Sequence, residues 1–170
     1  MKEFLKHFAW FVVLLLIQVL ILDQIHFLGV FIPFIYIYAI LRLPSNLSVN
    51  VVLIVSFLAG MIVDIFSNTP GMHASATTLL GFLRYPVLRL FVLKEDLGNR
   101  NVSVSWLGGV FWKYCVILVL IHHLTLFILE SFTLLNISQL LLKIPVCSLL
   151  TLLFIFAMES VNNKKDDRRS

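Results

Sequence analysis

Ionisable residues inside apolar segments are the part of this sequence that could do chemistry. A charge at membrane depth is costly, so each such residue is a candidate for function or for helix contact. A carboxylate near two histidines is typical of a metal site or a proton relay. The candidates are Asp64, Arg84, Arg89, Lys113, His122, His123 and Lys143.

The spacing of these residues argues against a shared metal or proton site. Neighbours on a helix point about 100° apart, so we expect that His122 and His123 do not face one site together. A rise of about 1.5 Å per residue also offsets Asp64 from Arg84 by roughly 15 Å along the membrane normal. We therefore predict no direct Asp64–Arg84 ion pair. Asp64 is expected to accept hydrogen bonds inside a helix bundle, and Arg89 to anchor a helix end.

Other catalytic patterns are missing from the sequence. There is no glycine-rich phosphate loop, no Ser or Cys nucleophile beside a base, and no facing pair of carboxylates. We therefore predict a protein that is not an enzyme and that uses no metal or cofactor.

Composition indicates which solvent surrounds these residues. The chain has 170 residues, of which 60% are hydrophobic and 13% charged, and its mean hydropathy is +1.00. Soluble domains are about half apolar and a quarter charged, so most of this chain is predicted to lie in a membrane. About six crossings fit the length. The predicted spans are Phe4–Leu22, Leu28–Leu43, Ser48–Phe66, Met72–Leu93, Ser105–Leu129 and Leu140–Met158.

These segments predict an all-α integral membrane protein, a compact bundle of about six helices over residues 1–161 with a charged tail at 162–170. The second segment is short and carries Pro33 near its start, so a kinked or partly re-entrant helix is an alternative. Five full crossings would place the termini on opposite sides. Six crossings place nine Lys and Arg residues on the cytoplasmic side and none in the three exported loops, which the positive-inside rule favours. The net charge of +4 therefore follows from topology, and no nucleic-acid partner is predicted.

The stretch from Phe57 to Arg84 predicts a tightly packed helical hairpin with its turn at Pro70 and Gly71. Small residues share helix faces on both sides of the turn, as in the pairs Ala74 with Thr78 and Thr77 with Gly81. Such surfaces let two helix backbones approach closely. The facing helix could belong to this chain or to a partner, and the sequence leaves both open.

The hairpin resembles the signature of the MreD family of rod shape-determining membrane proteins. The resemblance rests on a Gly-x-x-x-Asp helix end, a short turn, a Gly followed by His-Ala, and a later Gly; Pro33 resembles another recurrent family position. The matching residues are Gly60, Asp64, Gly71, His73, Ala74 and Gly81. With Thr77 and Arg84, they form the expected helix-packing or partner interface.

The resemblance implies a non-catalytic subunit of the cell-wall elongation complex in the bacterial inner membrane. It would bind MreC directly, alongside RodA, the class-B penicillin-binding transpeptidase and MreB, and help maintain rod shape. The fold would resemble the substrate-binding components of energy-coupling vitamin transporters. The polar turn Ser67–Pro70 departs from the family pattern, and the fifth and sixth spans match no motif of it.

Two other functions stay open. A substrate-binding subunit of a vitamin transporter would need an outward polar pocket, for which the sequence offers Asp64, His73, Glu130 and Lys143. A small intramembrane enzyme would need catalytic residues that the sequence does not display.

Overall fold

The structure is a computed structural model that describes residues 2–24, 32–98, 100–133 and 137–166. Within these ranges the chain is almost entirely helical, and one isolated antiparallel bridge joins Pro44 to Asn101. The elements are α1 (Lys2–Ile17), the π-helix η1 (Gln18–Leu22), α2 (Tyr36–Leu41), α3 (Val49–Ser67), α4 (Met72–Arg89), the 3₁₀ helix η2 (Lys94–Asp96), α5 (Val104–Leu107), α6 (Val110–Thr133) and α7 (Ile137–Asp166).

Three described helices are long and apolar enough to cross a membrane: Val49–Ser67, Val110–Ser131 and Leu142–Asn162. They coincide with the third, fifth and sixth predicted spans. The first predicted span contains a shorter apolar helix, Ala9–Leu22. The fourth forms α4, whose 18 residues include two arginines and one histidine. An all-helical membrane protein is therefore supported, while the prediction of six spans goes beyond these three helices.

The second predicted span is not one continuous helix, which corrects the simplest expectation. Its beginning, 28–31, lies outside the described residues. Residues 32–34 form no regular structure, and only Tyr36–Leu41 are helical. All six residues of α2 are buried. This segment therefore runs through the interior of the bundle, partly without helical hydrogen bonds.

Side chains of other helices satisfy the free backbone groups of this segment. Gln18 donates to the carbonyl of Pro33 over 3.2 Å and accepts from the amide of Ile35 over 2.8 Å. The amide of Phe34 donates to Thr151 Oγ1 over 3.0 Å. Irregular backbone is tolerated at membrane depth only where protein or water provides such partners.

The predicted fifth span is also interrupted. It is divided into α5 and α6 at Gly108, whose φ of 55° lies in the left-handed region that favours glycine. The prediction of one continuous helix from Ser105 was therefore wrong: a separate short turn, α5, precedes the long helix, which begins at Val110.

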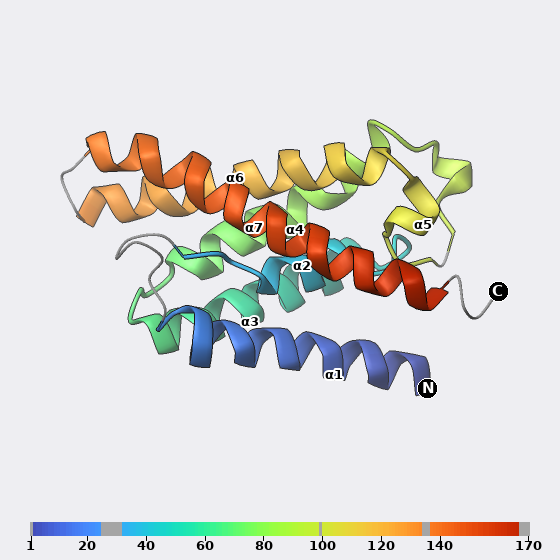
Figure 1. The fold of residues 1–170 in the computed structure, drawn as a ribbon, viewed down its shortest axis with the longest axis horizontal. Helices are drawn as coiled ribbons and strands as arrows, with labels where there is room; N and C mark the ends of the chain where they lie inside the picture. The colour runs from blue at the N-terminus through green and yellow to red at the C-terminus, as the bar shows by residue number, and fades with distance from the viewer. Residues whose placement is uncertain (1, 25–31, 99, 134–136, 167–170) are drawn as a thin grey trace.

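The long helices lie side by side along one axis (Figure 1). The start of α1 and the end of α7 lie at one end of the bundle, here called the terminal end. The α3–α4 turn, the end of α6 and the start of α7 lie at the other, here called the hairpin end. The main helix pairs are α3 with α4, α4 with α6, and α6 with α7.

Candidate functional site

The hairpin of α3 and α4 is held together by glycines that contact the opposite helix. A Cβ atom at Gly60 would lie 2.5 Å from the Cα of Ala74, on the α4 backbone. A Cβ atom at Gly81 would lie 2.9 Å from the Cβ of Ser56, on α3. No real Cβ contact is that short, so both glycines are needed for this approach. The helix that faces these small residues belongs to the chain itself.

Thr77 fills the space beside Gly60. Its hydroxyl donates to the carbonyl of His73 over 2.5 Å, and the side chain is fully buried. The hydroxyl thus bonds its own helix and leaves no unpaired donor in the contact.

Asp64 is the acceptor for the first turn of α4. Its carboxylate accepts hydrogen bonds from the amides of His73 and Ala74 and from the Thr69 hydroxyl, each over 2.9 Å. The first amides of a helix have no partner within it, and the N-cap residue Gly71, at φ 82°, has no side chain to offer. Asp64 therefore performs from α3 the function of a capping side chain. Its burial is high, with 5% of the residue exposed.

Arg84 binds elsewhere. Its guanidinium donates to the carbonyls of Leu43 and Pro44, just after α2, and only 2% of the residue is exposed. The prediction that Asp64 and Arg84 do not pair is confirmed, because each has its own buried partners at a different depth of the bundle.

A cluster of aromatic and histidine side chains lies next to the hairpin. Tyr36 Oη is 3.3 Å from His73 Nδ1 and 3.2 Å from His122 Nε2. His123 binds the Val119 carbonyl over 2.8 Å, and its Nε2 is 3.3 Å from Thr151 Oγ1. Four segments of the chain meet through these contacts.

His122 and His123 lie in one cluster, although their ring nitrogens bind different partners, Tyr36 and Thr151, so the expectation that they share no metal or proton site stays a prediction. The ring centroids of both histidines lie near that of Phe34, at 5.9 Å and 5.4 Å, and the His73 ring lies 5.1 Å from it. The irregular backbone around Phe34 places its ring against two adjacent residues of α6, His122 and His123. The two histidine rings also contact each other, with their centroids 5.4 Å apart, so the three rings form one aromatic cluster.

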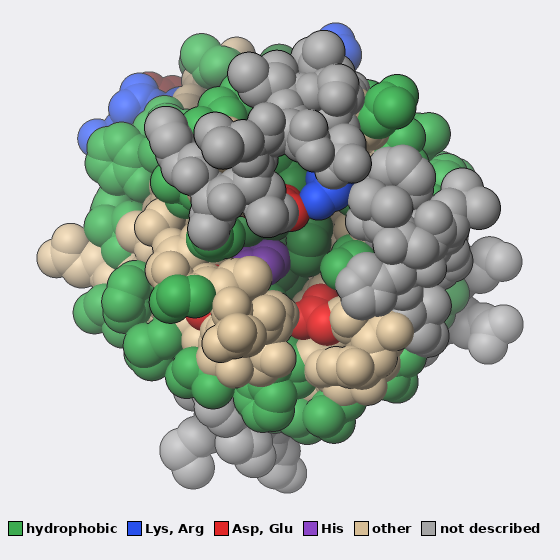
Figure 2. Space-filling view, turned by 90° about the vertical axis from the view of Figure 1, so that its left-hand side faces the viewer, with side chains coloured by type: hydrophobic (Ala, Val, Ile, Leu, Met, Phe, Trp, Pro, Cys, Tyr) green, Lys and Arg blue, Asp and Glu red, His purple; other side chains and the backbone are tan. Residues whose placement is uncertain are grey.

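The hairpin end is hollowed, and acidic, basic and histidine side chains surround the hollow (Figure 2). Three charged side chains described near this end have an ion-pair or hydrogen-bond partner. Lys143 Nζ lies 2.6 Å from Glu130 Oε1, and Asp23 accepts from Gln18 and from Ser67, each over 2.7 Å. The Nδ1 atom of His122 is a buried polar atom without a hydrogen-bond partner in the described part of the chain.

Sequence reasoning missed a buried ionic network near the terminal end. Glu159 is 2% exposed, accepts from the amide of Val104 over 2.8 Å and pairs with Arg42 over 3.3 Å. The hydroxyl of Tyr38 also donates to Glu159. The predicted sixth span stopped at Met158, whereas α7 continues to Asp166. The available signal for this pair was that Arg42 and Glu159 lie at the predicted ends of two spans.

A groove runs along the outer surface of the hairpin. Its volume is about 550 Å³, and its lining comprises Leu53, Phe57, Ala74, Ser75, Thr78, Leu79 and Phe82. The hydroxyls of Ser75 and Thr78 donate to carbonyls of their own helix, each over 2.6 Å. The groove is therefore apolar in effect, with small side chains between two exposed phenylalanines.

Taken together, the hairpin residues act by packing and capping. Gly60, Asp64, His73, Ala74 and Thr77 lie together where α3 meets the start of α4, while Gly81 and Arg84 lie farther along α4. Within the described residues, no group of three or more His, Cys, Asp or Glu side chains could hold a metal ion. Comparison of the chain with protein-family models, curated proteins and solved structures finds no match.

Proposed function

We propose that this protein is a non-catalytic membrane scaffold of the MreD type, which binds MreC and helps a rod-shaped bacterium maintain its shape. The hairpin end would face the periplasm, and the terminal end the cytoplasm of the inner membrane. RodA, the class-B penicillin-binding transpeptidase and MreB would belong to the same complex. The sequence resemblance suggests the family, and one structural observation supports a binding role.

That observation is the groove on the α3–α4 hairpin. Transmembrane helices associate through close packing against small residues, because lipid and protein are equally apolar. Ala74, Ser75 and Thr78 offer such a floor, and their hydroxyls are already satisfied. A partner helix could therefore bury this surface without leaving a polar group unpaired. The membrane helix of MreC is the proposed occupant.

The groove also decides which variants test the proposal. Leucine at Gly60 or Gly81 would separate α3 from α4, so a loss of binding would report on folding. Replacing Thr78 by Trp fills the groove from the outside, since its side chain is only half-buried. We expect Thr78→Trp to lower copurification with MreC by about tenfold, equivalent to one lost packing contact of about 1.4 kcal/mol.

The matched control is Leu124→Trp, at an exposed position on α6 outside the groove. It adds the same indole to the membrane-facing surface and should leave copurification unchanged. Both variants should unfold like the wild type. Normal MreC binding by Thr78→Trp, with rod shape retained, would reject the groove as the interface.

The hollow at the hairpin end favours a second candidate, a substrate-binding subunit of a vitamin transporter. Buried Tyr36, His73 and His122 lie together next to the hairpin, and His122 Nδ1 has no partner among the described residues. A bound vitamin stabilises its receptor by simple linkage. Micromolar vitamin should therefore raise the unfolding temperature, and a flat response across a vitamin panel would reject this candidate.

A further inference from the structure

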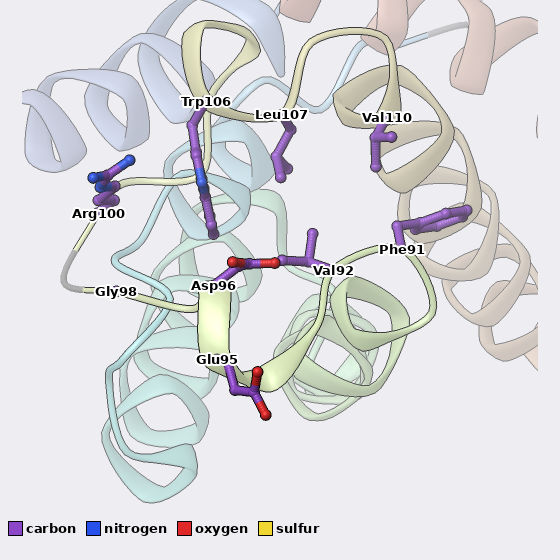
Figure 3. Close-up of a pocket in the computed structure, with 9 residues that line it drawn as sticks. All are labelled: Phe91, Val92, Glu95, Asp96, Gly98, Arg100, Trp106, Leu107 and Val110. Carbon is purple, nitrogen blue, oxygen red and sulfur yellow. The ribbon is translucent and has the colours of Figure 1, made fainter.

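A second pocket opens at the terminal end, between the end of α4 and the start of α6. Its volume is about 540 Å³, and its lining comprises Phe91, Val92, Glu95, Asp96, Gly98, Arg100, Trp106, Leu107 and Val110. In Figure 3, Trp106, Leu107 and Val110 lie on one side and Phe91 and Val92 on the other, with the Asp96 carboxylate between them. Arg100 lies at the edge. The pocket thus combines an apolar lining with acidic and basic side chains.

The polar groups of this pocket are available to a ligand. Within the described residues, the carboxylate of Asp96 and the guanidinium of Arg100 form no ion pair, with each other or with another residue. The indole N–H of Trp106 likewise has no hydrogen-bond partner there. Both charged residues are exposed, so their charged groups remain accessible from the solvent side of the pocket.

The surroundings of the pocket indicate a membrane surface. Leu90 is 73% exposed and Leu93 is 72% exposed, and both lie in the same connection as Phe91 and Val92. Exposed leucines next to charged residues and a tryptophan are typical of the boundary between headgroups and acyl chains. A lipid therefore reaches this pocket without leaving the bilayer.

We propose that the pocket binds the phosphoethanolamine headgroup of a zwitterionic membrane lipid. The ammonium group donates to Asp96, the phosphate accepts from Arg100, and the glycerol end contacts Trp106 and the apolar lining. A purely anionic headgroup has no cation to offer Asp96. A trimethylated choline headgroup keeps the charges but has no N–H to donate. The site thus distinguishes lipids by the hydrogens on their cationic nitrogen.

This inference does not depend on the groove or on MreC. It concerns the opposite end of α4 and requires only that the chain lies in a bilayer. Failure of the scaffold proposal would leave it untouched, and the reverse also holds.

The test is lipid binding to the purified full chain in detergent, followed by native mass spectrometry with phosphatidylethanolamine, phosphatidylcholine and phosphatidylglycerol of identical acyl chains. The wild type should retain phosphatidylethanolamine about fivefold better than the other two, as one partly exposed charge-assisted contact gives. Asp96→Asn should abolish the preference over phosphatidylcholine. Arg100→Gln should weaken the binding of all three lipids, because all three carry the phosphate.

The matched control is Lys94→Gln, a neighbouring exposed cation that does not line the pocket. It should leave all three affinities unchanged. Equal retention of the three lipids by the wild type, or an unchanged preference in Asp96→Asn, would overturn the proposal. Competition by soluble glycerophosphoethanolamine at the same concentration as the lipid would overturn the assignment to a bilayer lipid.

Discussion

Removal of the Asp64 carboxylate is expected to destabilise the hairpin more than any other single polar change at its turn. In Asp64→Ala, the amides of His73 and Ala74 lose their acceptor in a buried position. A buried donor left unpaired costs about 1–3 kcal/mol, so the two amides together cost about 2–6 kcal/mol. The Thr69 hydroxyl is only partly buried and adds little.

Asp64→Asn divides this cost in a way that the geometry predicts. Oδ1 binds His73 N and Thr69, whereas Oδ2 binds Ala74 N. An amide keeps one acceptor oxygen, so one of the two backbone donors remains satisfied. The expected loss is about 1–3 kcal/mol, roughly half of that for alanine.

The assay is equilibrium unfolding of the purified protein in mixed micelles with increasing SDS, followed by far-UV circular dichroism. Hydrogen exchange should become faster at the amides of both His73 and Ala74 in Asp64→Ala, and at only one of these two amides in Asp64→Asn. Glu95→Gln, on an exposed 3₁₀ helix, is the control and should shift stability by less than about 0.5 kcal/mol. Asp64→Ala with control-like stability and unchanged exchange at both amides would refute the capping interpretation.

Three further changes are predicted for the same unfolding assay. Gly60→Ala should cost about 1–3 kcal/mol, because its methyl group overlaps the α4 backbone, whereas Gly109→Ala, with open space around it, should be tolerated; equal stability of the two would contradict this contact. Glu159→Ala should cost about 3–5 kcal/mol by leaving Arg42 without its buried partner, and a smaller loss from the double change with Arg42→Met would identify the pair as the cause. Tyr36→Phe should cost about 1–2 kcal/mol through two lost histidine contacts, and a neutral result would show that they contribute no net stability.

Local sequence patterns predicted the hairpin well. Among the predicted small-residue pairs, Thr77 and Gly81 lie on the face of α4 that meets α3, whereas Thr78 lines the outer groove. The boundaries of α3 fall within one residue of the prediction. Depth along a helix follows directly from residue number, which is why the separation of Asp64 from Arg84 was also predictable.

The interior of the bundle could not be read in the same way. The second segment is apolar throughout, so hydropathy favours a helix, and nothing local reveals that Gln18 and Thr151 replace helical hydrogen bonds. Glu159 lay beyond a predicted span end, where hydropathy gives no reason to expect burial. In both cases the hydrogen-bond or ion-pair partner is more than one hundred residues away or on another helix. A local sequence pattern does not show which residues of other helices lie close in space.

The irregular segment around Phe34 has a consequence for the order in which the chain assembles. One of its amides is satisfied by Thr151, a residue 117 positions later in the chain. During synthesis, this amide enters the membrane long before its acceptor exists. The segment must therefore wait beside water or inside the insertion machinery until α7 arrives. Insertion of the last long helix thus completes the first part of the chain, and truncation before α7 should leave the N-terminal half susceptible to proteolysis.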